Sequence, residues 1–289
     1  MEPILTGLVL GGLYALLAQS FVLTFVTTKT LSFALGEFVA LGAFGGLALM
    51  SWDWLPDIGK AVIAIIAVGV IGALVFRFLI VPFTTEGEHD TRWLLSTVAL
   101  SFVLLNLLAN VEGASPQRSE LGRFVGFVNV LGTRLAWQDV VIALVAIGVS
   151  LLLILLTRTT SLGMVMRAVA QDPEIASLMG VSPRRTGMVT YAVAMGIAAL
   201  AGVLWAAKVG ASPEIGAPLL VASIAVAVVG GLGSLWGPLL GGVLYGVLTQ
   251  VMSFQFGSVW GDTSGLLLVM AVLVFRPEGL IARKTEVKL

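Results

Sequence analysis

The chain has 289 residues, of which 58% are hydrophobic and only 11% are charged. A water-soluble domain carries charge at roughly a quarter of its positions, so this composition excludes an ordinary soluble protein and indicates that lipid surrounds most of the surface. The 16 basic and 16 acidic residues cancel, so no net charge favours binding to nucleic acid.

Nine apolar segments are candidates for membrane-spanning helices, because a helix needs about 20 mostly apolar residues to cross the hydrocarbon core. In chain order they are residues 4–26, 31–50, 61–81, 93–111, 140–156, 187–207, 218–235, 236–252 and 263–275. The last is short for a full crossing unless it extends back across Asp262, so we expect eight to nine spans. With no polar insertion large enough to fold separately, residues 1–289 should form one all-α transmembrane bundle.

Basic residues predict the orientation, since cytoplasmic loops carry an excess of lysine and arginine. If the N-terminus lies outside and all nine segments cross, only five of the 16 basic residues face outward, namely Lys60, Arg118, Arg123, Arg134 and Lys208. The stretch 112–138 is then extracytoplasmic and should contain a short interfacial segment or a strand pair. The loop 158–186 and the C-terminus are then cytoplasmic.

The cytoplasmic loop should begin with a short amphipathic helix over residues 161–171. Leu162, Val165 and Val169 have the spacing of one helix face.

A second short helix is expected over residues 173–179. Asp172 is a favoured N-cap, Pro173 suits the first helical position, and Gly180 suits the residue that ends the helix. Ile175, Leu178 and Met179 would give this helix an apolar side. That side either packs on the chain's own membrane domain or docks another protein.

Glu37 is the sharpest feature inside a predicted span, because a carboxylate facing lipid costs several kcal/mol. It should face the bundle interior, where it either supports a helix end or lines the pathway and recognises a cationic group. Gln19, Asn106 and Gln250 are further interior polar candidates, for which hydrogen bonding between helices is the default role. Glycines from Gly230 to Gly242, including Gly231 and Gly233, indicate close helix packing, with a turn between Gly233 and Gly237. An alternative for these glycines is an interrupted helix lining a transport site.

Several motifs resemble the permeases of the branched-chain amino acid ABC transporter family. They are RAVAQDPEIASLMGV at 167–181, GLVLGGLYAL at 7–16, GEF at 36–38, GGLGS at 230–234 and RPEGL at 276–280. They follow one order along the chain and are closest to the shorter of the two permeases that such systems pair. Where the family has Asn and His before the Gly-Glu pair, this chain has Ser32 and Leu35.

The resemblance implies that the loop 158–186 contacts an ATPase subunit. The residues it assigns to this coupling are Arg167, Asp172, Pro173, Glu174, Ile175, Ala176, Leu178, Met179, Gly180 and Arg184. As candidates for the translocation pathway we take Ser32, Glu37, Gln19, Asn106, Gly231 and Gly233.

By the same resemblance, the chain is half of the pore of an ATP-driven importer in a bacterial or archaeal inner membrane. The implied solute is a branched-chain or other hydrophobic amino acid, although family members also carry urea, amides or small carboxylates. The implied partners are a second, different permease, two ATP-binding subunits and an extracytoplasmic solute-binding protein.

No catalytic or cofactor motif is evident in the chain. It has no Gly-x-x-x-x-Gly-Lys-Ser/Thr run for ATP, and its single histidine, His89, has no second nitrogen or sulfur ligand for a metal. We therefore expect no enzymatic activity and no bound cofactor, with ATP and magnesium held by partner subunits. The alternative is an ion-coupled secondary transporter, which should have several interior acids, whereas only Glu37 qualifies.

Overall fold

The computed structural model describes residues 1–289 except 50–53, 84–91, 114, 118–125, 131–132 and 282–289. The long helices are α1 Glu2–Thr28, α2 Leu35–Ala48, α3 Asp57–Val75, α4 Arg92–Glu112, α5 Trp137–Thr159, α8 Pro183–Lys208, α9 Gly216–Gly230, α10 Trp236–Phe256 and α11 Ser258–Phe275. Two short helices, α6 Ser161–Gln171 and α7 Pro173–Leu178, lie between α5 and α8. A π-helical turn, η2 Phe76–Ile80, and two 3-10 turns, η3 Val81–Phe83 and η4 Pro213–Ile215, complete the helical elements.

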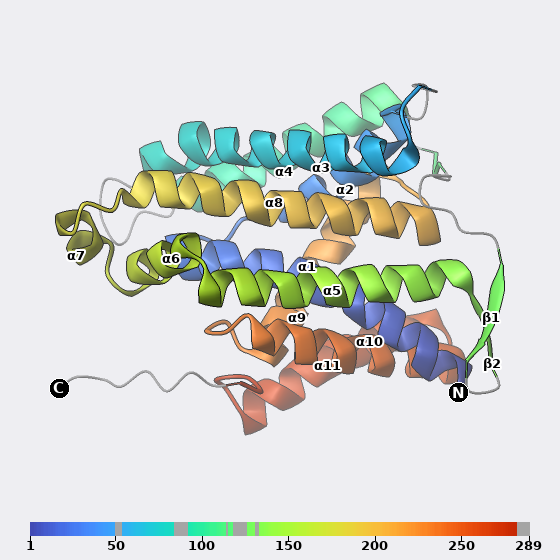
Figure 1. The fold of residues 1–289 in the computed structure, drawn as a ribbon. Coiled ribbons are helices and arrows are strands. Elements are labelled where there is room, and N and C mark those ends of the chain that lie inside the picture. The colour runs from blue at the N-terminus through green and yellow to red at the C-terminus, as the bar shows by residue number, and fades with distance from the viewer. Residues whose placement is uncertain (50–53, 84–91, 114, 118–125, 131–132, 282–289) are drawn as a thin grey trace.

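The helices form an elongated bundle with different structures at its two ends (Figure 1). The N-terminus and a β-hairpin lie at one end, and α6 and α7 project from the other. Strands β1 Phe127–Val130 and β2 Thr133–Ala136 pair antiparallel, with Phe127 opposite Ala136. This hairpin confirms the strand pair expected between residues 112 and 138.

Among the described residues, 8 helices are long and apolar enough to cross a membrane. They confirm the predicted helical membrane bundle. The last, α11, begins at Ser258 and therefore continues across Asp262, which gives it the length that the predicted segment 263–275 lacked.

The second predicted span differs from the expectation. Helix α2 has 14 residues, which rise about 21 Å and fall short of the roughly 30 Å hydrocarbon core. Residues 29–34 precede it as non-helical chain, in which Thr30 and Ser32 are buried. The segment begins at exposed Lys29 and passes into the bundle, where protein surrounds the backbone from Thr30 to Ala34 as non-helical chain near a membrane requires.

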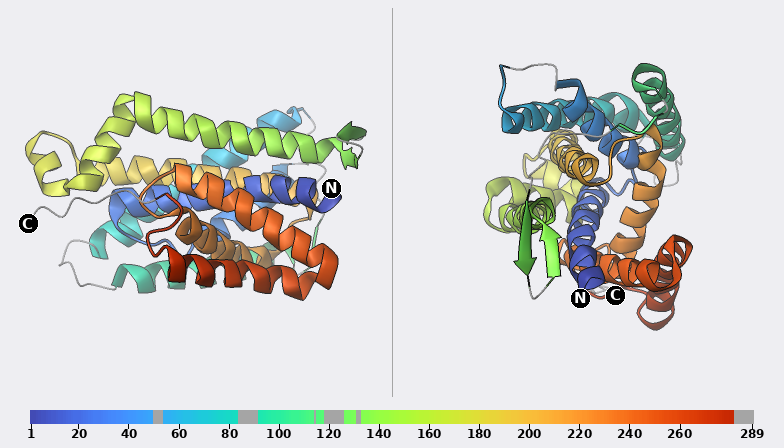
Figure 2. Two further views of the ribbon diagram at one scale, coloured as in Figure 1. Left: turned by 90° about the horizontal axis from the view of Figure 1, so that it is seen from below. Right: turned by 90° about the vertical axis from the view of Figure 1, so that its right-hand side faces the viewer.

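Helices α1 and α8 form the centre of the bundle (Figure 2). Small residues bring their neighbours close: a Cβ added at Gly202 on α8 would lie 2.0 Å from the carbonyl oxygen of Val39 on α2. Only van der Waals packing and hydrogen bonds hold helices together in lipid, so such close approaches carry much of the association.

The first four and last four long helices correspond to one another. Helix α1 packs along α10 and α8 along α3, while α2 packs on α8 and α9 on α1. In Figure 1, α1 and α8 run in opposite directions. The two halves are therefore inverted relative to each other, and each contains a long helix, an irregular segment and a short helix in the same order. The last helices of these two series, α2 and α9, are shorter than α1 and α8, and they contact each other.

Candidate functional sites

Helix α7 is held in place by both of its ends. Asp172 Oδ1 accepts hydrogen bonds from the backbone amides of Glu174 at 2.9 Å and Ile175 at 3.0 Å. At the other end, Gly180 has φ of 84° and the Val181 amide donates to the Ala176 carbonyl at 3.0 Å. This pattern of bonds around a left-handed glycine terminates a helix. The predicted cap and stop are confirmed.

Three apolar side chains of this fixed helix face away from the protein. Ile175 is 60% exposed, Leu178 is 86% exposed and Met179 is 80% exposed, whereas Ala176 is only 4% exposed. We call Ile175, Leu178 and Met179 the α7 surface. Of the two interpretations left open by the sequence, packing of these side chains on the chain's own membrane domain is wrong. The helix packs through Ala176 instead.

The packed face of α6 matches the predicted one only in part: Val169 is buried and Val165 is half-buried, but Leu162 is exposed. Gly163, Met166 and Val169 are buried, whereas Leu162 is 59% exposed. The face is set by Gly163, at which an added Cβ would lie 2.2 Å from the Thr157 carbonyl oxygen. Only a glycine lets α6 turn this closely against the end of α5, and Leu162 is consequently left outside.

The remaining residues assigned to ATPase coupling do not all lie on the exposed surface. Pro173, Glu174 and Arg184 are exposed beside the α7 surface. Arg167 instead turns away from it, and its Nη2 donates to the Arg158 carbonyl at 3.4 Å.

A second candidate site is the junction of α2, α4 and α9, which contains Glu37. The Glu37 side chain is 3% exposed, and its Oε1 accepts a hydrogen bond from Ser101 on α4 at 3.2 Å. A Cβ added at Gly216, the first residue of α9, would lie 2.7 Å from Oε1 and 2.9 Å from Oε2. The carboxylate thus lies against the start of α9, whose positive dipole end favours a negative charge.

Glu37 therefore connects three helices, as the supporting role predicts, although its partners are a serine and a glycine of other helices. Its second oxygen has no hydrogen-bond partner. The junction lies between the two short helices of the inverted halves, and many transporters with inverted repeats bind their solutes at such an interface. Ser101 and Gly216 were not among the predicted site residues. The sequence Ser212-Pro213-Glu214 before an apolar run is a helix-start signal that points to Gly216.

The other pathway candidates lie in three separate places. Ser32 is buried in the irregular segment before α2, with no hydrogen-bond partner for its hydroxyl. Gln19 is buried on α1, and its Nε2 donates to the Leu235 carbonyl at 3.0 Å, which confirms an interior hydrogen bond between distant segments. Gln250 is half-buried on α10.

Asn106 contradicts the expectation of an interhelical hydrogen bond. It is exposed on α4, and its Nδ2 donates to the Phe102 carbonyl of the same helix at 2.7 Å. Asn110, one turn later, is also exposed and donates to the Asn106 carbonyl at 2.7 Å. The side of α4 that faces away from the bundle therefore carries two amides in an otherwise apolar helix.

The glycine cluster forms both a close contact and a turn. Helix α9 ends at Gly230, and a Cβ added there would lie 2.2 Å from the Gly237 carbonyl carbon on α10. The turn begins at Gly231, earlier than predicted, with φ of 103°. Exposed Gly233 and the rest of this turn lie beside α6 and not in the middle of the bundle. The chain after α11 completes the end of α9, because the Leu280 amide donates to the Val229 carbonyl at 2.9 Å.

Within the described residues, no group of three or more histidine, aspartate or glutamate side chains is placed to hold a metal ion. His89, the arginines Arg118 and Arg123 and the basic tail beyond Ile281 lie outside the described residues.

Comparisons with known proteins agree over nearly the whole chain. The chain is 29% identical to the high-affinity branched-chain amino acid transport system permease protein BraD of Pseudomonas aeruginosa, with 98% of the chain and 96% of that protein aligned. It is 27% identical to the corresponding permease protein LivH of Escherichia coli, over the same 98% and 96%. It is 26% identical to a probable branched-chain amino acid transport permease protein LivH of Methanocaldococcus jannaschii, over 96% of the chain and 92% of that protein.

No solved structure matches the chain. Residues 3–275 match the family model described as branched-chain amino acid transport system, permease component. The match covers the helices from α1 to α11, including α2 and α9 of the Glu37 junction and the capped α7. The chain belongs to this family of branched-chain amino acid transport permeases.

Proposed function

We propose that the chain forms half of the pore of an ATP-driven importer and takes up movement from an ATPase through α7. In this proposal, two ATP-binding subunits hold ATP and magnesium, and a second, different permease completes the pore. An extracytoplasmic binding protein delivers a branched-chain or other hydrophobic amino acid, and the names of the relatives specify branched-chain amino acids. The membrane is the inner membrane of a bacterium or archaeon.

The distribution of basic residues supports a cytoplasmic α7 end. Eight basic residues of the described chain belong to elements at this end, namely Lys29, Arg77, Arg92, Arg158, Arg167, Arg184, Arg185 and Arg276. Three belong to elements at the opposite end, namely Lys60, Arg134 and Lys208. An excess of lysine and arginine is typical of the cytoplasmic side, and this distribution supports an N-terminus on the outside.

The observation that carries the proposal is the exposure of the α7 surface. Leu178 is 86% exposed and Met179 is 80% exposed, although the backbone that bears them is fixed by Asp172 and Gly180. Exposed apolar side chains on an ordered helix outside the membrane mark a binding surface for another protein. A rigid helix also transmits movement better than a loose loop. It can pass a displacement through Ala176 and the buried face of α6 to the end of α5.

The exposed side of α4 supports a second permease as partner. An amide facing lipid is unfavourable, and Asn106 and Asn110 would both face lipid in an isolated chain. We infer that this side of α4 faces the second permease and the solute pathway between them. Glu37 then acts behind the pathway wall, where it holds α4 to α2 and α9 through Ser101.

The test changes the α7 surface without changing the fold. We expect the double substitution Leu178→Ser with Met179→Ser to reduce the amount of ATPase that co-purifies with the tagged chain. Burying a leucine or methionine contributes about 1.5–3 kcal/mol, so losing most of both weakens docking by roughly 30- to 1,000-fold. The matched control is Ile58→Ser with Val259→Ser, at positions 81% and 75% exposed at the opposite end of the bundle.

Loss of ATPase docking can be distinguished from loss of the fold. The α7 variant should keep the thermal midpoint of the purified chain, lose its ATPase and lose solute-dependent ATP hydrolysis in proteoliposomes, while the control retains all three. Normal co-purification and normal hydrolysis in the α7 variant would refute the docking role. Uptake of leucine, urea, an amide and a small carboxylate by the intact system then identifies the solute class.

A further inference from the structure

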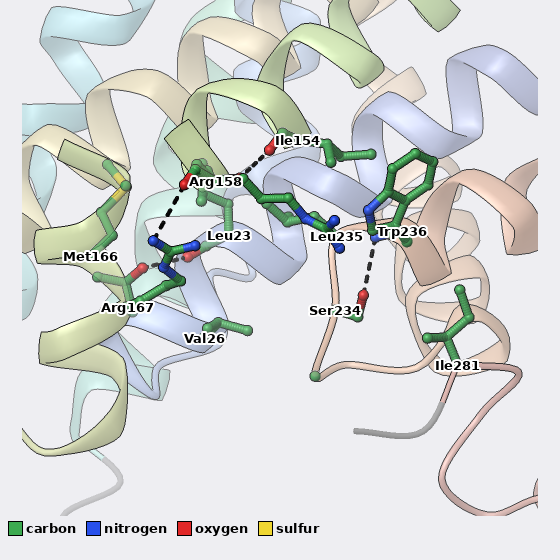
Figure 3. A pocket seen from close by; sticks show the side chains of 14 residues that line it. Leu23, Val26, Ile154, Arg158, Met166, Arg167, Ser234, Leu235, Trp236 and Ile281 are labelled. Carbon is green, nitrogen blue, oxygen red and sulfur yellow. Dashed lines mark hydrogen bonds between the residues drawn. The ribbon is translucent and has the colours of Figure 1, made fainter. Parts of the chain in front are cut away.

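A pocket of about 580 Å³ opens at the α7 end of the bundle, and the functions proposed above do not use it (Figure 3). Its walls come from the end of α1, the end of α5, the buried side of α6, the turn between α9 and α10, and Ile281. Because helices α1 and α5 end here and α10 begins here, the pocket lies where membrane spans meet the membrane surface.

The charges in the pocket are all of one sign. Arg158 and Arg167 both line it, and no carboxylate is among its fourteen lining residues. Neither arginine forms an ion pair with an acid within the described part of the chain. Arg167 bonds only to the Arg158 carbonyl, and the Arg158 guanidinium lies 5.6 Å from the centre of the Trp236 ring. In Figure 3 the Arg158 guanidinium points toward Trp236 and the Arg167 guanidinium toward the Arg158 carbonyl, so the pocket contains two positive charges without a negative charge beside them, and an anion that enters it would be favoured.

The other lining groups define the shape of that anion. Ser234 Oγ accepts from the Trp236 amide at 3.2 Å, which leaves its own hydroxyl hydrogen free to donate to an acceptor. Most of the remaining wall is hydrocarbon, including Leu23, Val26 and Ile154. A ligand with a phosphate at one end and an acyl chain at the other satisfies both parts of the pocket.

We propose that this pocket binds the phosphate of an anionic phospholipid between Arg158 and Arg167. The two arginines supply cationic donors from different sides of the pocket, Ser234 adds a hydroxyl, and Trp236 places an aromatic ring at the depth of the lipid headgroup. Basic pockets at the ends of membrane helices are suited to such headgroups. The bound lipid would connect α6 to α5 and to the α9–α10 turn, and so would stiffen the base on which α7 stands. The inference requires only that the chain spans a membrane, and it holds whichever permeases or ATPases accompany it.

Trp236 provides a direct probe of occupancy, because bromine atoms on an acyl chain quench tryptophan fluorescence on contact. The full chain, in the complex in which it purifies, is titrated with brominated phosphatidylglycerol in phosphatidylcholine micelles. The signal of the site is the quenching that Trp236→Phe removes. We expect brominated phosphatidylglycerol to quench at low mole fraction and brominated phosphatidylcholine to quench only at high mole fraction.

Charge variants test the assignment of the arginines. Each attraction of this kind near a membrane surface is worth about 1 kcal/mol, or roughly fivefold in binding. Arg158→Gln with Arg167→Gln should therefore raise the half-saturating mole fraction by about 25-fold. Arg276→Gln, an exposed arginine at the same end and outside the pocket, should leave it unchanged. If the glutamine pair does not fold, Arg158→Lys with Arg167→Lys keeps both charges and should still prefer phosphatidylglycerol over phosphatidylcholine.

Glycerol 3-phosphate distinguishes a lipid from a soluble phosphate. If millimolar glycerol 3-phosphate leaves the quenching by phosphatidylglycerol intact, the site is a lipid site. If it displaces the lipid, the pocket belongs to a soluble phosphate compound and the lipid assignment is wrong. Equal quenching by both brominated lipids, or quenching unaffected by loss of both arginines, would overturn the site itself.

Discussion

The junction of α2 and α9 allows a graded test of how the bundle is held together. A Cβ added at Gly36 would lie 2.1 Å from the Gly216 carbonyl oxygen, a contact between two backbones. A Cβ added at Gly216 would meet the Glu37 carboxylate at 2.7 Å, a contact with the end of a side chain. At Gly148, on the exposed side of α5, an added Cβ would meet nothing within 4 Å.

These distances predict that Gly36→Ala destabilises the bundle most, Gly216→Ala less and Gly148→Ala not at all. An ordinary contact needs about 3.5 Å, so Gly36→Ala must separate α2 from α9 by more than about 1 Å. Overpacking costs about 1–3 kcal/mol, and loss of the Glu37–Ser101 bond adds about 1.5–3 kcal/mol, for a total of roughly 2.5–6 kcal/mol. For Gly216→Ala the cost is about 1–3 kcal/mol, because the carboxylate can move. The control Gly148→Ala should gain up to about 1 kcal/mol of helix propensity.

Thermal unfolding of each purified variant in detergent, at a fixed scan rate, measures this order of stability. At roughly 2 °C per kcal/mol, the midpoint should fall by about 5–12 °C for Gly36→Ala and about 2–6 °C for Gly216→Ala, and should not fall for Gly148→Ala. A double-mutant cycle identifies the cause, since Gly216→Ala should cost little in a Glu37→Ala background. The same cost of Gly216→Ala in both backgrounds would refute the contact with Glu37. A Gly36→Ala variant as stable as Gly148→Ala would refute the close approach of the helices.

Two further predictions concern the ends of the proposed coupling path. Asp172→Ala removes both side-chain hydrogen bonds that cap α7 and should destabilise that helix by about 1 kcal/mol. Hydrogen exchange of the α7 amides should rise several-fold, while exchange in α8 stays unchanged; protection equal to that of the parent protein would contradict the capping role. Asn106→Leu removes an amide that bonds only within its own helix, so the thermal midpoint of the isolated chain should not change. Recovery of the second permease in a pull-down should fall, and full recovery with normal uptake would show that this side of α4 faces lipid.

The sequence determined the membrane class, the number and rough extent of the long helices, and the capped α7. These features depend on local properties. Apolar length decides which segments enter lipid, and a residue such as Asp172 caps a helix through amides only two and three positions away. The resemblance of short motifs also identified the family, because those motifs keep their order along the chain.

Only the tertiary structure decided which way each side chain faces. Asn106 and Glu37 both lie in apolar runs, yet one is exposed and the other is buried against Gly216, which lies far along the chain. The predicted face of α6 was wrong at Leu162, although Val169 is buried as expected, because Gly163 packs on the end of α5, a contact that periodicity within one helix cannot reveal. The break before α2 likewise depends on neighbours that surround its backbone. Lipid and the protein interior are both apolar, so an apolar sequence pattern cannot tell which side chains face lipid and which face other helices. The packing of helices from the two inverted halves decides this.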